Sequence, residues 1–246
     1  MMATVPRVRM FAGPNGSGKS TIRTLLRPEL IGVYINPDEI QSSLLQTGKL
    51  DFCAFDVSAL PEELTQFFAQ SALIEKAGLT SILPQLQFEH NAMAVPDSSI
   101  NAYLASVAAD FIRRKLVAAG TSFTFETVMS SPDKIEFLKT ARTQGYRTYL
   151  YFIATEDPAI NVSRVRNRVS LGGHDVPEDK IVARYHRSLS LLLHAIRQSD
   201  RAYVFDNSSS QQRWIAEITD GHQLELKVDQ VPQWFQRAVL DKVPTQ

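Results

Sequence analysis

The chain has 246 residues, and its 26 Lys and Arg residues balance its 26 Asp and Glu residues, so the formal net charge is zero. Proteins that bind nucleic acid through its phosphates usually carry a basic excess, so this balance does not favour a polynucleotide substrate. The single cysteine, Cys53, excludes an internal disulfide and a multi-cysteine zinc site. Apolar runs of signal-peptide or membrane-spanning length are absent from the sequence, so we expect a cytoplasmic protein without membrane contact.

Strands and helices alternate along most of the chain. Short apolar runs predict strands at about 8–12, 33–35, 122–126, 146–153 and 202–205. Helical spacing, with Pro near several starts and Gly near several ends, predicts helices at about 20–26, 37–46, 61–77, 100–116, 133–145, 158–171, 177–199 and 232–240. This alternation predicts an α/β fold with a mostly parallel sheet, covered on both faces, that binds ligands at the carboxyl ends of its strands.

We expect a single domain over residues 1–246, with two added segments. Residues 48–98 are interpreted as an inserted helical segment, in which 61–77 predicts a helix and the stretch 81–96 shows no clear period. Residues 212–246 read as a hairpin followed by a closing helix, since Asp220 and Gly221 are a strong turn signal between two strand-like runs.

The first of these strands leads into the most informative motif. Residues 13–20 read G-P-N-G-S-G-K-S, which fits the phosphate-loop pattern G-x-x-x-x-G-K-[S/T]. Glycines let backbone N–H groups approach phosphate oxygens, Lys19 adds a positive charge, and the Ser20 hydroxyl is a ligand for Mg²⁺. We therefore expect a nucleoside triphosphate at Gly13, Pro14, Asn15, Gly16, Ser17, Gly18, Lys19, Ser20 and Thr21.

Three carboxylates follow predicted strands, where ligands of such sheets bind. Asp38 could orient and deprotonate an acceptor hydroxyl, or it could simply stabilise the start of its helix. Glu126 could hold the water shell of Mg²⁺, bind a substrate hydroxyl, or be a solvated strand end. Asp206 follows the last of these strands, and a structural role is the preferred interpretation for it.

Two arginine-bearing helices, at about 158–190, flank the hinge-like glycines at 172 and 173. Their shared faces carry Arg164 with Arg168 and Arg184 with Arg187. Such a pair of helices can form a lid that closes over the nucleotide and neutralises the charge of the transferring phosphoryl group. The alternative is an ordinary solvated charged face.

Four segments together resemble the zeta-toxin family, in its broad bacterial branch described as predicted ABC-type ATPases or kinases. They are AGPNGSGKST at 12–21, NPDEI at 36–40, FET at 125–127 and GGHDVP at 172–177. The resemblance covers residues 5–45 and 100–210. It implies a three-layer P-loop kinase fold with ATP and Mg²⁺, and its toxin members phosphorylate a sugar hydroxyl of UDP-N-acetylglucosamine. Relatives act on other nucleotide metabolites such as NAD.

The resemblance also implies roles for individual residues. Lys19 and Ser20 match the residues that bind ATP and Mg²⁺, and Asp38 matches the catalytic base. Glu126 and Thr127 match a pair near the acceptor, and Arg168 is the best match to a lid arginine. We expect Arg164 or Arg184 to act together with Arg168. Two features depart from the family pattern. His174 stands where zeta toxins carry a second lid arginine, and the 48–98 insertion has no counterpart in the sugar-nucleotide kinases.

We therefore predict an ATP-dependent small-molecule kinase that phosphorylates a hydroxyl of a nucleotide sugar or similar metabolite, with a small antitoxin protein as a partner that the family implies. Two alternatives stay open at this point. One is an ATPase that works as a regulatory or binding module without any acceptor. The other is a polynucleotide 5′-hydroxyl kinase that uses the arginine lid on the nucleic-acid backbone, against which the neutral net charge counts.

Overall fold

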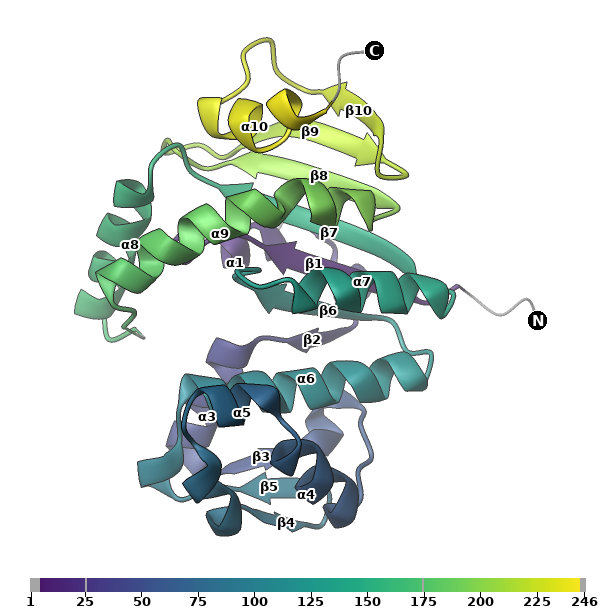
Figure 1. Ribbon diagram of the computed structural model, residues 1–246, viewed down its shortest axis with the longest axis vertical. Helices are drawn as coiled ribbons and strands as arrows, with labels where there is room; N and C mark the ends of the chain where they lie inside the picture. Colours follow the sequence, from purple (N-terminus) through teal and green to yellow (C-terminus); the bar gives the residue numbers. More distant parts are fainter. Residues whose placement is uncertain (1–4, 25, 174, 244–246) are drawn as a thin grey trace. The chain divides into compact units, whose positions relative to one another are not determined.

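The computed structural model describes residues 5–24, 26–173 and 175–243 (Figure 1). Its internal contacts divide the chain into two compact units. Unit 1 consists of residues 1–31 and 124–246, and unit 2 of residues 32–123. The predicted insertion at 48–98 lies inside unit 2, and the single-domain organisation over 1–246 stays a prediction.

Unit 1 is built on a twisted, mixed sheet. Its strands are β1 (Arg7–Ala12), β6 (Phe123–Thr127), β7 (Arg147–Ala154), β8 (Arg201–Asp206), β9 (Arg213–Thr219) and β10 (Gln223–Leu226). They lie in the order β10-β9-β8-β7-β1-β6. The pairs β1–β7 and β7–β8 are parallel, whereas β8–β9 and β9–β10 are antiparallel. The predicted α/β fold with a mostly parallel core is therefore confirmed.

The central strands are apolar because both of their faces are covered. Nearly every residue of β1 and β7 is buried. On one face the rings of Phe11, Tyr151 and Tyr203 stack across three strands, with centroids 4.8 and 5.0 Å apart. Ile22 packs into the same cluster from the helix after the phosphate loop, so the first strand and its helix share one core.

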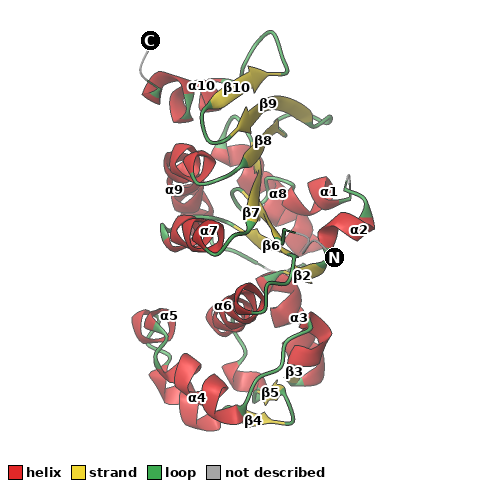
Figure 2. Ribbon diagram, turned by 90° about the vertical axis from the view of Figure 1, so that its right-hand side faces the viewer, coloured by secondary structure: helices red, strands yellow, loops and turns green. Residues whose placement is uncertain are grey.

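Helices cover this sheet on two sides, as Figure 2 shows. The helices α7 (Asp133–Thr143) and α9 (Glu178–Arg197) lie on one face, and α1 (Lys19–Arg23) lies on the other. α1 is shorter than predicted. α8 (Pro158–Ser170) packs against α9, while α2 (Pro28–Ile31) and α10 (Gln233–Ala238) are short. Within the described ranges, no helix is both long and apolar enough to cross a bilayer.

The C-terminal hairpin is confirmed. β9 and β10 pair through Thr219 and Gln223, and the turn between them contains Asp220 and Gly221, both with positive φ. Two positive φ angles in succession give the turn the twist that antiparallel strands need. The apolar residues Trp234 and Phe235 of α10 are buried, so the predicted closing helix is part of the core.

Unit 2 contains both helices and strands, and the segment 48–98, predicted as a helical insertion, also contains three short strands. Its elements are β2 (Val33–Ile35), α3 (Pro37–Thr47), β3 (Lys49–Asp51), α4 (Pro61–Ala69), α5 (Ala72–Lys76), β4 (Gln87–Glu89), β5 (Ala92–Ala94) and α6 (Ala102–Ala118). β3, β5 and β4 form a separate antiparallel sheet. β2 matches the strand predicted at 33–35, whereas β3, β4 and β5 have only three residues each and were not predicted, because such short strands show no clear period.

The predicted helix at 61–77 is divided into α4 and α5. The division occurs at Gln70 and Ser71, where the Ser71 hydroxyl accepts a hydrogen bond from the Ile74 N–H at 3.4 Å and so caps α5. Serine competes for backbone hydrogen bonds in this way, which favours helix starts over helix interiors.

A buried ion pair on α6 leads to a stability prediction. The side chain of Arg113 is 2% exposed, and its Nη2 lies 2.8 Å from Asp110 Oδ1. Burial tends to raise the pKa of Asp110, but the charge and hydrogen bonds of Arg113 and Arg114 outweigh it, so this pKa lies below its ordinary value. The pair is therefore most stabilising when the Asp110 carboxylate is ionised.

Asp110→Asn is expected to lower the free energy of unfolding by about 2–3 kcal/mol at pH 7, because the negative charge 2.8 Å from the buried Arg113 guanidinium is removed. Urea titrations of both proteins should show the difference shrinking as pH falls through the folded-state pKa of Asp110, where the wild-type carboxylate becomes protonated. The variant Arg114→Gln removes only the exposed partner and should cost less than about 1 kcal/mol. Equal losses in the two variants would contradict a buried pair.

Candidate functional site

The phosphate loop follows β1 directly, and its backbone runs close to two other segments of unit 1. Gly16 and Gly18 have φ of 74° and 95°, a region that strains any residue with a Cβ. A Cβ on Gly16 would lie 2.6 Å from the Asn161 carbonyl oxygen, and one on Gly18 would lie 2.3 Å from Asn207 Nδ2. Glycine is thus required here by the packing of the loop itself, in addition to its predicted approach to phosphate.

Lys19 lies inside this loop. It is 9% exposed, and its Nζ donates hydrogen bonds to the carbonyl oxygens of Gly13 at 2.9 Å and Pro14 at 3.0 Å. A lysine ammonium has three donors and a compact charge, so it can exchange such bonds for phosphate oxygens. The side chain is therefore placed where the motif requires a cation.

The structure brings Ser20 and Glu126 together, although 106 positions separate them. Ser20 Oγ lies 3.3 Å from Oε1 and 3.4 Å from Oε2 of Glu126, whose residue is 8% exposed. The described residues hold no group of three or more His, Cys, Asp or Glu side chains that could bind a metal. A hydroxyl and one carboxylate suit Mg²⁺, which usually keeps several waters and takes other ligands from nucleotide phosphates.

Thr127 follows Glu126 at the end of β6. Its Oγ1 accepts a hydrogen bond from the Met129 N–H at 3.0 Å, and Met129 has a φ of 52°. The hydroxyl therefore stabilises a strained turn after the strand. A contact between Thr127 and an acceptor stays a prediction.

Asp38 belongs to unit 2, in the first turn of α3. The N-cap of this helix is Asn36, whose Oδ1 accepts a hydrogen bond from the Asp38 N–H at 3.0 Å. The Asp38 side chain is exposed and forms no hydrogen bond or ion pair within the described ranges. Asn36, and not Asp38, therefore caps the N-terminus of α3. The role of Asp38 as a catalytic base stays a prediction.

Unit 2 also contains a cavity of about 500 Å³ beside α3. Its lining includes Tyr34, Glu39, Ser43, Asp51 and Phe55. Asp38 lies about 100–180° around the helix axis from the lining residues of α3, because each residue turns the helix by about 100°. This cavity therefore lies on a different side of α3 from Asp38, and we do not include it in the site.

The predicted lid corresponds to α8 and α9, which pack through Val162, Val165, Val176 and Ile181. Two of its arginines have contacts in unit 1. Arg184 Nη1 lies 3.4 Å from Oδ1 of Asn15 in the phosphate loop, and Arg164 Nη2 lies 3.4 Å from the Ser209 carbonyl oxygen. Arg184 is therefore placed at the loop, as a nucleotide-binding arginine would need to be.

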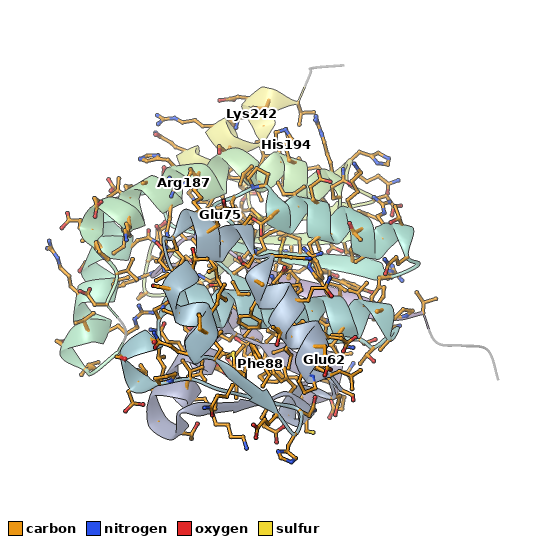
Figure 3. The ribbon with its side chains drawn as sticks, turned by 60° about the horizontal axis from the view of Figure 1, so that its bottom comes forward. Glu62, Glu75, Phe88, Arg187, His194 and Lys242 are labelled. Carbon is orange, nitrogen blue, oxygen red and sulfur yellow. The ribbon has the colours of Figure 1, made fainter. Side chains whose placement is uncertain are left out.

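The other lid residues differ in their surroundings. Arg168 is half-buried near the C-terminal end of α8, and its carbonyl accepts a hydrogen bond from the Gly173 N–H at 2.9 Å. Arg187 is exposed on α9 and is labelled in Figure 3, and its pairing with Arg184 stays a prediction. His174 lies outside the described residues.

Asp206 has structural partners, as its sequence position indicated. It is 1% exposed, and its carboxylate accepts hydrogen bonds from Trp234 Nε1 at 2.9 Å and Arg213 Nη2 at 3.0 Å. These contacts tie β8 to β9 and α10, so its carboxylate stabilises the C-terminal part of unit 1.

Two asparagines at the loop were not predicted from sequence. Asn161 Nδ2 donates to the Asn15 carbonyl oxygen at 2.6 Å, and Asn207 Nδ2 donates to the Ser17 carbonyl oxygen at 2.8 Å. Neither asparagine lies in a recognisable motif, and each contact joins positions at least 146 residues apart. Only the fold brings these groups together.

Known proteins resemble this chain in part of its sequence and in its fold. Residues 91–216, just over half of the chain, match the family described as Zeta toxin. An uncharacterized protein of Haemophilus influenzae is 35% identical over 63 residues, which are 26% of this chain and 45% of that protein. This chain thus matches less than half the length of that relative.

Similar solved structures include the AvrRxo1-ORF1:AvrRxo1-ORF2 complex with sulphate ions, at a TM-score of 0.57 and 13% identity over 98% of this chain and 66% of the other. The same complex with ATP has a TM-score of 0.57 and 13% identity, over 98% of this chain and 65% of the other. At this identity the likeness concerns the fold. By this family match, the chain belongs to the zeta-toxin family.

Proposed function

We propose that the protein is an ATP-dependent kinase that phosphorylates a hydroxyl of a nucleotide sugar, such as UDP-N-acetylglucosamine, or of a similar nucleotide metabolite. The observation that carries the proposal is the grouping of Lys19, Ser20 and Glu126 at an intact phosphate loop, with Arg184 at the same loop. The similar AvrRxo1 complex was solved with ATP, which supports ATP as the donor here.

In this proposal the loop amides and Lys19 bind the β- and γ-phosphates, and Ser20 with Glu126 would hold Mg²⁺. When bound, the ion would offset phosphate charge and orient the γ-phosphoryl group. Asp38 orients the acceptor hydroxyl and accepts its proton as the new oxygen–phosphorus bond forms. The bond between the γ-phosphorus and the bridging oxygen then breaks, and ADP leaves.

The lid arginines complete the proposed mechanism. Negative charge spreads over the phosphoryl oxygens during transfer, and a guanidinium can bind two of them through its planar fork of N–H donors. Arg168, with Arg164 or Arg184, supplies this charge. Transfer of the phosphoryl group to water would make the protein an ATPase module, and transfer to a 5′-hydroxyl would make it a polynucleotide kinase.

Incubation of the purified protein with labelled ATP and a metabolite extract tests this function. Mass spectrometry should detect a phosphorylated nucleotide metabolite that is absent when Asp38→Asn replaces the wild type. Release of inorganic phosphate alone would support the ATPase alternative instead. Labelling of 5′-hydroxyl oligonucleotides, with an affinity that falls steeply as salt rises, would support the polynucleotide kinase.

Glu126→Gln tests the proposed Mg²⁺ site. The substitution keeps the size of the side chain but removes its charge, so we expect the Mg²⁺ concentration for half-maximal transfer to rise about tenfold, as for loss of one charged ligand contact. Titration of activity with Mg²⁺ at fixed ATP measures this shift. Glu136→Gln, an exposed change on α7, is the matched control, and equal curves for both variants would exclude Glu126 from the metal site.

The family also implies an antitoxin, and we propose a small protein partner with a cytoplasmic location for both. The similar AvrRxo1-ORF1 chain was solved in complex with AvrRxo1-ORF2, which supports such a pairing in this fold. Co-expression of the protein with its neighbouring gene products, followed by purification, checks the proposal. A stable complex that blocks transfer is the expected result.

A further inference from the structure

The helix α8 contacts the phosphate loop through the side chain of Asn161. This residue is fully buried, and its amide uses both ends: Nδ2 donates to the Asn15 carbonyl oxygen at 2.6 Å, and Oδ1 accepts from the Thr155 hydroxyl. The Thr155 carbonyl in turn accepts a hydrogen bond from the Tyr185 hydroxyl at 2.7 Å. This chain of bonds connects the loop to both lid helices and to the end of β7.

A second asparagine holds the loop two residues further on. Asn207 follows β8, and its Nδ2 donates to the Ser17 carbonyl oxygen at 2.8 Å. Both asparagines therefore bind carbonyl groups of the loop, and neither binds its N–H groups. The contacts are close, because a Cβ on Gly16 or Gly18 would collide with Asn161 or Asn207 respectively.

Planar trans peptide units give these bonds a consequence for phosphate binding. In such a unit the C=O of one residue and the N–H of the next point in opposite directions. When Asn161 holds the carbonyl of Asn15, the N–H of Gly16 is directed away from α8. When Asn207 holds the carbonyl of Ser17, the N–H of Gly18 is likewise directed away from Asn207.

We propose that Asn161 and Asn207 are positioning residues that aim the Gly16 and Gly18 amides at the phosphates of the nucleotide. The inference rests on the proposed nucleotide site. Loop amides bind phosphate tightly only when they are already oriented, because orientation on binding costs conformational entropy. The two asparagines remove that cost before the nucleotide arrives.

Asn161 has a second consequence for the lid. Arg164 and Arg168 follow it by three and seven residues, so all three lie on one face of α8. A rise of about 1.5 Å per residue places these arginines about 4.5 and 10.5 Å along the axis from Asn161. The bond between Asn161 and Asn15 therefore anchors to the loop the helix that carries both arginines. α8 also packs beside α9, as Figure 1 shows.

The test uses Asn161→Leu, which keeps the size of the side chain and suits a helix, and Asn207→Ala, which changes a partly exposed residue. Calorimetry with ATP, Mg²⁺ and no acceptor should show the dissociation constant rising about tenfold in each variant, the effect of one lost hydrogen bond. Inorganic tripolyphosphate should lose affinity by a similar factor. Asn167→Leu, an exposed change on α8, should leave both affinities unchanged.

Hydrogen–deuterium exchange of the nucleotide-free protein gives a readout apart from binding. Peptides that cover residues 13–21 should exchange faster in both asparagine variants, while β7 and α9 peptides keep their protection. Unchanged affinity and unchanged loop exchange in Asn207→Ala, with a folded protein, would overturn the proposal even if Asn161→Leu failed to fold. Failure of the wild type to bind ATP at all would overturn the proposed function instead.

Discussion

Lys19→Ala is expected to reduce the affinity for ATP by about 100–1,000-fold. Two or more charge-assisted hydrogen bonds to phosphate oxygens would be lost, each contributing about 1.5–3 kcal/mol. The side chain is nearly buried among the loop carbonyls, so its ammonium group is already held at the loop. Calorimetric titration with ATP and Mg²⁺ measures the loss directly.

The control for this prediction is Lys139→Ala, which removes an exposed lysine from α7 in the same unit. It should bind ATP as the wild type does. The thermal midpoint should be recorded for both variants, because Lys19 also bonds to its own loop. Nucleotide affinity retained in a folded Lys19→Ala protein would contradict a phosphate-binding role for the motif.

Asp38→Asn is expected to slow phosphoryl transfer by about 10²–10⁴-fold while the dissociation constant of ATP changes less than about twofold. A general base contributes a rate factor of this size, and an amide cannot accept the proton of the acceptor hydroxyl. The carboxylate is exposed, and Asn36 supplies the helix cap, so the substitution should leave the fold intact. Single-turnover transfer with saturating ATP separates the chemical step from binding.

Glu39→Gln changes the next carboxylate of the same helical turn and is the matched control. It should transfer phosphate at the wild-type rate. If Asp38→Asn also kept the wild-type rate, Asp38 would be an ordinary first-turn acid of α3, stabilised by the helix dipole, and another group would have to accept the proton.

Local sequence determined the class of the fold and the loop at its centre. A strand, a glycine-rich turn and a helix lie next to one another in the chain, so the local sequence was enough to predict the structure of residues 8–23. The alternation of strands and helices in unit 1, the hairpin at Asp220 and the structural role of Asp206 were also predictable. Each of these features depends on the spacing of apolar residues or on turn residues within a short stretch of the chain, so no distant contact has to be known to predict it.

Short elements of unit 2 and the surroundings of the site were decided by tertiary structure. The three-residue strands β3, β4 and β5 show no clear period, and a capping serine divides a stretch that the sequence pattern predicts as one helix. The approach of Glu126 to Ser20, and of Asn161 and Asn207 to the loop, joins positions more than 100 residues apart. A hydrogen bond forms within about 3 Å in space whatever the separation along the chain, so sequence alone could name the loop but not the side chains that hold it.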